Sequence, residues 1–103
     1  MGMFDTARKV PLYCAKGRHD FLGDIQYKPS IALENGKFYR PDMRETDFGE
    51  PIEKMPPGSH TFSGTGWCPE HDPRGTDWLR YIRCEVFIED GRIVRVVQLP
   101  EKA

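Results

Sequence analysis

IRCEVFIEDGRIVRVVQL, residues 82–99, is the stretch of sequence that decides the fold. Two runs rich in β-branched residues flank Asp90-Gly91, and an Asp-Gly pair in such a setting is a strong signal for a β-hairpin with a two-residue type I′ turn. A two-residue loop pairs Glu89 with Arg92 and Ile88 with Ile93. The sequence therefore predicts an antiparallel hairpin over residues 82–99.

Uninterrupted pairing from that turn assigns each side chain to a face, because side chains alternate along a strand. The predicted core face consists of Ile82, Cys84, Val86, Ile88, Ile93, Val97 and Leu99. The opposite face carries Phe87, Val94 and Val96, together with Arg83 and Glu85. Since this outer face is also partly apolar, we expect another strand or a binding partner to cover half of it.

The rest of the chain also favours strands. Asn35-Gly36 separates residues 31–34 from residues 37–40 and predicts a second hairpin, with Leu33 opposite Phe38 and Glu34 opposite Lys37. Residues 24–28 alternate as a strand does, residues 59–63 do so more weakly, and no apolar repeat has helical spacing over a dozen positions. The prediction is a mainly β protein, a small antiparallel sheet or partly open barrel built from hairpins, forming one domain over residues 1–103.

Composition sets limits on function. The chain has 103 residues, a net charge of -1, 38% hydrophobic residues and 30% charged residues, which is typical of a soluble globular domain. A balanced charge gives no overall attraction to nucleic acid or to anionic lipid. No apolar run reaches the ~20 residues of a membrane helix, and residues 1–5 lack the apolar core of a signal peptide. A cytoplasmic location without a membrane contact is therefore expected.

Residues 41–58 form a long acidic segment in which Gly49, Pro51, Pro56 and Pro57 interrupt any regular element. Its acidic residues are Asp42, Glu45, Asp47, Glu50 and Glu53, against the basic residues Arg44 and Lys54. Loops of this length are usually functional or disordered. Two interpretations stay open: a solvated excursion of the chain, or a binding loop anchored by Phe48, Ile52 and Met55.

Two cysteine–histidine clusters carry the clearest chemistry. Cys14 and His19 form one, Cys68 and His71 form the other, and together they supply the two sulfurs and two imidazoles of a closed tetrahedral zinc site. We predict structural zinc bound by Cys14, His19, Cys68 and His71, with His60 as an alternative to His19. Cysteines and histidines without a metal, or a disulfide between Cys14 and Cys68, are the competing interpretations.

The third cysteine has a different role. Cys84 falls on the predicted core face of its strand and is expected to be a buried hydrophobic residue. An odd number of cysteines also excludes a complete set of disulfides within the chain, so reduced or metal-bound thiols fit better.

Other function classes find little support in the sequence. No nucleophile motif, phosphate-binding loop or His-Glu-x-x-His pattern occurs, so we assign no catalytic residues and expect no enzyme. The segment with Arg8, Lys9, Lys16 and Arg18 is locally basic, and Tyr13 and Phe21 lie within or beside it as aromatic residues able to stack on bases. Nucleic-acid binding is therefore kept as an alternative.

The N-terminal residues Met1-Gly2-Met3-Phe4-Asp5-Thr6 resemble the opening of a group of small phage and prophage proteins. Members follow that opening with a cysteine-bearing knuckle and an extended Gln-Thr-Lys segment. Here Cys14 and His19 occupy the place of the knuckle, and Ile25-Gln26-Tyr27-Lys28 is similar to the extended segment, with tyrosine in place of threonine. This chain lacks a Cys-x2-Cys pair there. The resemblance implies a phage or prophage origin, the cytoplasm of a bacterial host, and no established activity.

These observations favour a non-enzymatic accessory module that binds a protein, such as a phage-encoded inhibitor of a host enzyme or defence system. Central apolar anchors within a polar rim are typical of protein-binding surfaces. The candidate residues are Glu45, Asp47, Phe48 and Glu50 in the acidic segment, and Phe87, Val94 and Val96 on the outer hairpin face. A nucleic-acid-binding zinc module and a virion or assembly component are the alternatives.

Overall fold

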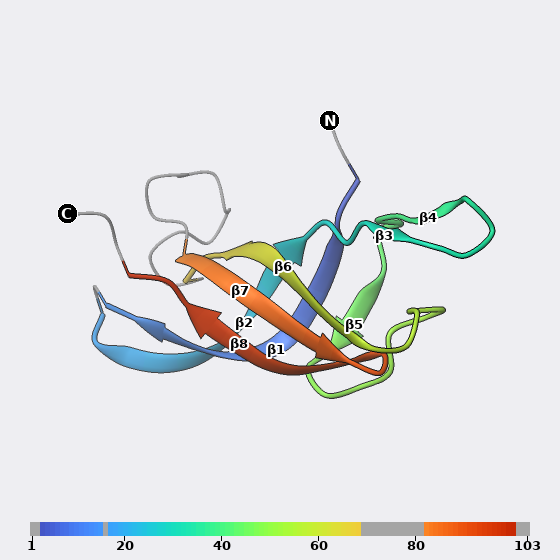
Figure 1. Ribbon diagram of the computed structural model, residues 1–103. Helices are drawn as coiled ribbons and strands as arrows, with labels where there is room; N and C mark the ends of the chain where they lie inside the picture. The colour runs from blue at the N-terminus through green and yellow to red at the C-terminus, as the bar shows by residue number, and fades with distance from the viewer. Residues whose placement is uncertain (1–2, 16, 69–81, 101–103) are drawn as a thin grey trace.

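The chain folds as a mainly β protein, as predicted. The structure, a computed structural model, describes residues 3–15, 17–68 and 82–100, and these contain no helix. The longer strands are β1 (Asp5–Cys14), β2 (His19–Tyr27), β6 (Ser59–Gly66), β7 (Ile82–Glu89) and β8 (Arg92–Gln98). The shorter ones are β3 (Ile31–Ala32), β4 (Phe38–Tyr39) and β5 (Glu45–Asp47) (Figure 1). No helix in the described part of the chain is long and apolar enough to cross a membrane.

Six strands form one curled sheet in the order β5-β1-β2-β6-β7-β8, and β3 and β4 form a separate two-stranded sheet. The sheet is mixed, because β5 pairs with β1 in parallel while the other neighbours are antiparallel. Its curl makes a half-barrel and brings β8 against β1 (Figure 1). The partly open barrel expected from the sequence is thus observed.

The core lies inside the curl and consists mainly of alternate residues of β1, β2, β7 and β8. Its buried members are Ala7, Val10, Leu12, Ile25, Tyr27, Ile52, Cys84, Val86, Ile88 and Ile93. Between β2 and β7, strand β6 contributes Gly64, where an added Cβ would lie 2.6 Å from Cγ2 of Ile25. The absence of a side chain at Gly64 lets the core residue of β2 pack directly against the β6 backbone.

The C-terminal hairpin turns where the sequence predicts, but its register changes partway. Asp90 and Gly91 both have positive φ, at 47° and 83°, as a type I′ turn requires. Ile88 pairs with Ile93 as expected, and a β-bulge next to this pair then shifts the remaining pairs by one residue. Val96 therefore pairs with Val86 and packs against the core, whereas Val97 is 37% exposed.

The predicted faces of Val96 and Val97 were consequently wrong. A bulge places an extra residue on one strand and reverses the side-chain alternation beyond it. The bulge here leaves Val94 48% exposed. Beyond it, residues that uninterrupted pairing assigns to the core face lie on the outer face, and residues assigned to the outer face lie on the core face.

The second hairpin exists, but its register differs by one from the prediction. Ile31 pairs with Tyr39 and Ala32 with Phe38, and the Leu33 N–H donates to the Lys37 carbonyl at 2.8 Å. The loop thus has three residues, because only Gly36 has a positive φ and Asn35 does not. A three-residue loop that ends in a left-handed glycine is the next commonest hairpin connection after the two-residue turns.

Side-chain and loop backbone hydrogen bonds, rather than a continuous strand ladder, close the half-barrel. At one end the side-chain amide of Gln98 accepts from the Tyr13 N–H at 2.6 Å and donates to the Tyr13 carbonyl at 3.1 Å. At the other end the Ile52 N–H donates to the Gly91 carbonyl at 2.7 Å, and the Arg92 guanidinium donates to the Gly49 carbonyl at 3.0 Å. Part of the acidic segment therefore fills the gap between β1 and the turn of the C-terminal hairpin.

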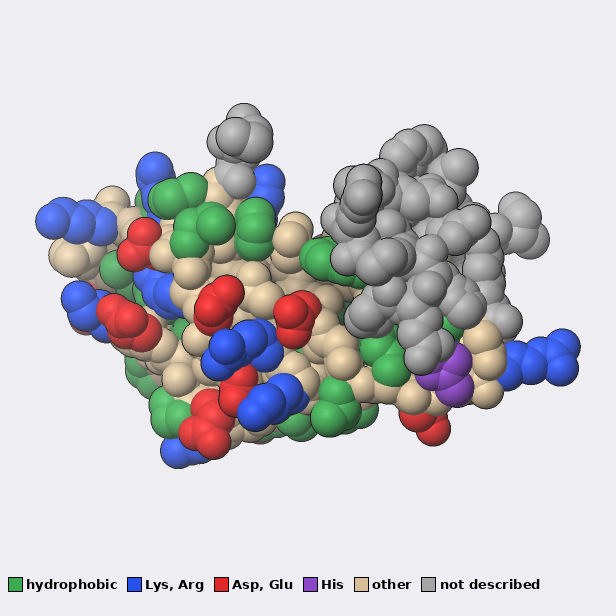
Figure 2. All heavy atoms as spheres, turned by 180° about the vertical axis from the view of Figure 1, so that it is seen from behind, with side chains coloured by type: hydrophobic (Ala, Val, Ile, Leu, Met, Phe, Trp, Pro, Cys, Tyr) green, Lys and Arg blue, Asp and Glu red, His purple; other side chains and the backbone are tan. Residues whose placement is uncertain are grey.

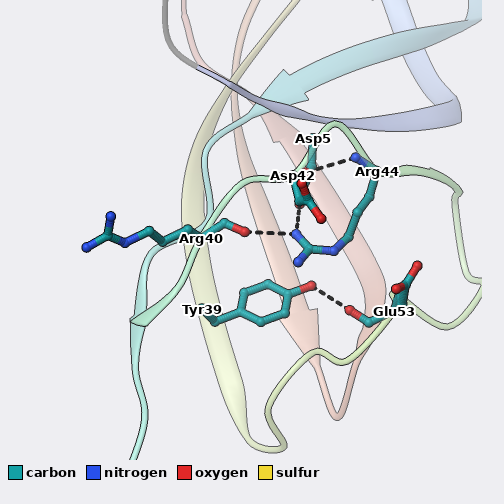
Figure 3. Close-up of polar contacts among 6 residues, drawn as sticks. All are labelled: Asp5, Tyr39, Arg40, Asp42, Arg44 and Glu53. Atoms are coloured by element: carbon teal, nitrogen blue, oxygen red, sulfur yellow. Dashed lines mark hydrogen bonds and ion pairs between the residues drawn. The ribbon is translucent and has the colours of Figure 1, made fainter. Parts of the chain in front are cut away.

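The acidic segment is anchored by Asp5, which is fully buried at the start of β1. Its carboxylate accepts from the backbone N–H groups of Asp42 and Arg44 at 2.8 and 3.1 Å, and from the Arg44 guanidinium at 2.9 Å (Figure 3). The guanidinium lies 4.3 Å from the centre of the Tyr39 ring, and the Tyr39 hydroxyl donates to the Glu53 carbonyl. A buried carboxylate with these partners fixes the path of residues 39–44 toward β5.

The strand register predicts a difference between two chemically identical substitutions. Val86→Ala removes fully buried methyl groups and should lower the free energy of unfolding by about 2–3 kcal/mol. Val97→Ala removes exposed methyl groups and should cost no more than ~0.5 kcal/mol. Urea unfolding measures both. Equal losses would mean that Val97 is in the core and that the bulge is absent.

The Asp5 contacts predict a large effect with a matched control. Asp5→Ala leaves two backbone donors and a guanidinium without their acceptor, so a loss of about 3–5 kcal/mol is expected. Asp42→Ala should stay within ~0.5 kcal/mol, since Asp42 contributes its backbone N–H to this cluster and its side chain is exposed. Thermal or denaturant unfolding of the two variants decides, and similar losses would contradict the anchoring role.

Candidate metal site

The first two candidate ligands face each other at the end of the β1–β2 hairpin. Cys14 is the last residue of β1, His19 is the first of β2, and the two are paired in the ladder. Along β1 the side chains of Val10, Leu12 and Cys14 are all buried, so the alternation of the strand places the Cys14 sulfur on the core side. In the connection between these two strands, Arg18 has a φ of 53°.

The third ligand comes from a distant part of the chain. Cys68 follows β6 by two residues, and its sulfur lies 3.9 Å from Nε2 of His19. The ligand atoms of Cys14, His19 and Cys68 all lie within 4.8 Å of one another, and both cysteines are 5% exposed. Two sulfurs and one imidazole thus converge on a single point and could hold a metal ion.

Backbone groups orient two of these ligands. The Gly17 N–H donates to the Cys14 sulfur at 3.3 Å, which fixes the position of this sulfur. Nδ1 of His19 lies 3.3 Å from the Asp20 carbonyl, and because a carbonyl only accepts, this nitrogen is the donor. In the neutral ring Nε2 then carries the lone pair on the side of Cys68, as a metal-ligating histidine requires.

The other predicted histidines are placed differently. His71 lies outside the described residues, so its predicted part as a ligand stays a prediction. The ring of His60 stacks on Phe62, with the centroids 6.3 Å apart, and its Nε2 lies 3.2 Å from the Pro57 carbonyl. His60 does not belong to the Cys14, His19 and Cys68 group, so the structure favours His19 over His60 as the histidine ligand.

Cys84 is a buried hydrophobic residue, in agreement with the sequence. Its exposed fraction is 0%, it belongs to the core cluster, and burial raises the pKa of its thiol to about 11. The three cysteines therefore divide into two that converge with a histidine and one that is held neutral in the core.

The residues predicted for partner binding fall into two groups. In the acidic segment, Asp47 bonds to Arg8 and Lys9 at 2.9 and 3.2 Å, and Phe48 packs against the core. On the C-terminal hairpin, Phe87 is partly exposed with the Arg95 guanidinium 4.3 Å from its ring centre. Val96 packs against the core, whereas Val94 and Val97 are exposed. Glu45 and Glu50 are exposed.

The two basic residues of β1 are paired with acidic side chains. Arg8 and Lys9 lie at a β-bulge in β1 and both contact Asp47, with Glu45 3.9 Å from the Arg8 guanidinium. The hydrogen bond from Lys9 and the charge of Arg8 lower the pKa of the Asp47 carboxyl. Basic and acidic side chains alternate across the face seen in Figure 2. This pairing reduces the positive charge that β1 offers to a nucleic-acid backbone.

No residue type in the sequence indicates the groups that support the site. The charges of Arg8 and Lys9 favour interpretation as a basic segment, whereas the apolar alternation of Val10, Leu12 and Cys14 is the signal for a strand. Once that strand is recognised, a hairpin with Cys14 opposite His19 follows. The contacts from Gly17 and Asp20 are made by backbone groups. They depend on the loop geometry, so no residue type in the sequence indicates them.

Comparison of the chain with family models, with curated proteins and with solved structures found no match. The residues and their geometry are therefore the basis for any statement on function.

The contrast among the cysteines predicts their reactivity. With a pKa of about 11, Cys84 has only ~1 thiolate in 10⁴ at pH 7, so iodoacetamide should leave it unmodified in the folded protein. Denaturation should expose it to full alkylation. Peptide mass spectrometry after timed labelling measures both states, and rapid labelling of native Cys84 would contradict its burial.

Proposed function

We propose that this protein is a non-enzymatic, zinc-stabilised β domain that acts by binding a protein partner. The convergence of Cys14, His19 and Cys68 supports the zinc, and the apolar outer surface of the C-terminal hairpin supports the partner. A phage-encoded inhibitor of a host enzyme or defence system is the concrete form of this proposal. The phage origin in this statement is supported only by the resemblance of the N-terminal residues.

Zinc suits the three ligand types better than the hard cations do. Magnesium and calcium take oxygen ligands, whereas thiolate and imidazole together select zinc or another soft transition metal. A fourth protein ligand would close the tetrahedron and leave no position for substrate, which favours structure over catalysis. His71, three residues beyond Cys68, is the sequence candidate for that position.

The location of the ligands explains what such a zinc ion would stabilise. Cys14 and His19 belong to one hairpin, whereas Cys68 begins the connection from β6 to β7. Strand β2 pairs with β6 over three residues only, Ile25 to Tyr27 with Gly64 to Gly66. A metal bound by these ligands would add a tie between two halves of the sheet that share a short ladder.

The outer surface of the C-terminal hairpin supports protein binding. Val94 and Val97 are exposed there, Phe87 is partly exposed, and Arg95 lies over the Phe87 ring. Apolar groups within a rim of charge are typical of protein interfaces, in which aromatic residues and arginine dominate the binding energy. The bulge adds Val97 to this surface in place of Val96.

Metal analysis tests the zinc proposal. Purified protein should contain about one zinc ion per chain, and removal by a chelator should lower Tm, because structural metal binding is coupled to folding. Cys68→Ser should lower both the zinc content and Tm, while Cys84→Ala should retain the zinc at whatever cost in packing. Metal-free protein with an unchanged Tm in chelator would exclude a structural zinc site.

Binding measurements test the interaction proposal once crosslinking in host cells has identified a partner. Phe87→Ala and Val97→Ala should raise the dissociation rate by roughly tenfold or more if they are central anchors. Leu22→Ala is the matched control, since Leu22 is a 67% exposed apolar residue on β2. Glu45→Lys and Glu50→Lys should slow association with a basic partner at low salt. Unchanged kinetics in all four variants would exclude both surfaces.

A further inference from the structure

Two of the three converging ligands are thiols that lie close enough to react with one another. The sulfurs of Cys14 and Cys68 lie within 4.8 Å, and both residues are nearly buried but not fully enclosed. Disulfide formation needs the sulfurs at about 2.05 Å, so the two sulfurs have to approach each other by less than ~3 Å. The geometry that suits a metal therefore also suits a disulfide.

His19 lies beside the two sulfurs. Its Nε2 lies 3.9 Å from the Cys68 sulfur, and its Nδ1 lies 3.3 Å from the Asp20 carbonyl. The imidazole therefore belongs to the same group of ligand atoms as the two thiols.

A backbone group holds the Cys14 sulfur in position. The Gly17 N–H donates to this sulfur at 3.3 Å. Cys84 provides the contrast, because it is fully buried in the core. The difference in environment marks one reactive pair and one inert cysteine within the same chain.

We propose that Cys14 and Cys68 form a peroxide-sensitive thiol pair, which oxidises to a disulfide and releases the metal that the two sulfurs hold with His19. The metal part of this statement rests on the zinc site proposed above. The thiol part does not, because the two sulfurs and the imidazole converge without it.

The oxidation balances with hydrogen peroxide as the oxidant. The Cys68 sulfur attacks one peroxide oxygen, an S–O bond forms, and the O–O bond breaks. The leaving hydroxide becomes water with the Cys68 thiol proton, or with a solvent proton where the sulfur began as a metal ligand. The Cys14 sulfur then attacks the Cys68 sulfenic acid. The S–S bond forms as the S–O bond breaks, and the second hydroxide leaves as water with the Cys14 thiol proton, or with a solvent proton where the thiolate began as a metal ligand.

The test uses the intact protein as purified, its zinc content measured first. Stoichiometric hydrogen peroxide should lower the mass by about two hydrogens, peptide mapping should give a Cys14–Cys68 disulfide, and a chromophoric chelator should detect about one zinc ion released per chain. Dithiothreitol with added zinc should reverse all three changes. The mapping is made on the parent chain, so it does not depend on whether a variant folds.

Variants identify the pair. Cys84→Ala should form the disulfide at the parent rate, whereas Cys14→Ser should stop at a sulfenic acid on Cys68 that dimedone traps.

The outcomes separate the two proposals. A Cys14–Cys68 disulfide formed by protein that takes up no zinc even after reduction and addition of the metal supports the thiol pair and overturns the metal site. Bound zinc with no Cys14–Cys68 disulfide after peroxide overturns the thiol pair and leaves the metal site intact. A disulfide that includes Cys84 would also overturn the pairing proposed here.

Discussion

The structure depends on β1 being held along both of its edges. One edge pairs with β2 over nearly the whole strand. The other edge has no single partner strand: β5 pairs with Thr6 to Arg8, and the Gln98 side chain bonds to the backbone of Tyr13. Unpaired strand edges are costly when buried and prone to aggregation when exposed. The curl of the sheet and the course of the acidic segment follow from how this edge is covered, and the candidate site lies on the side of β1 that pairs with β2.

Local turn chemistry predicted much of this fold from sequence. Asp90-Gly91 fixed one hairpin because both residues have positive φ. At Asn35-Gly36 only the glycine does, so the same kind of dipeptide gave a loop of three residues. The predicted register of the first hairpin is correct up to its β-bulge, and that of the second differs by one residue because its turn has other backbone angles. One inserted residue moves every later side chain to the opposite face. No pattern of residue types distinguishes Val96 from Val97 in a run of β-branched residues.

Long-range contacts were beyond prediction for a different reason. Strand β1 carries three basic or proline residues among its apolar ones, and a bulge at Arg8 and Lys9 breaks its alternation. Its burial depends on partners that lie far away in sequence, such as Arg44 for Asp5 and Gln98 for Tyr13. The cysteine–histidine inventory was visible in the sequence, but the convergence of Cys14, His19 and Cys68 needed β6 to lie beside β2.

The two ends of β1 are stabilised by different chemistry, and this difference has a functional consequence. At its start, Asp5 and Arg44 form a buried, fully bonded pair whose contacts do not depend on a metal or on redox state. At its end, Cys14 joins a group of ligand atoms whose stabilising effect depends on what they bind.

A change at this group of ligand atoms would therefore act on the β1–β2 hairpin end and the start of the β6–β7 connection, while the Asp5 end and the core between them persist. Because β8 reaches β1 through Gln98 at Tyr13, one residue before Cys14, the same change would reach the C-terminal hairpin directly. The proposed metal or thiol site and the proposed binding surface are thus joined by a single side-chain amide.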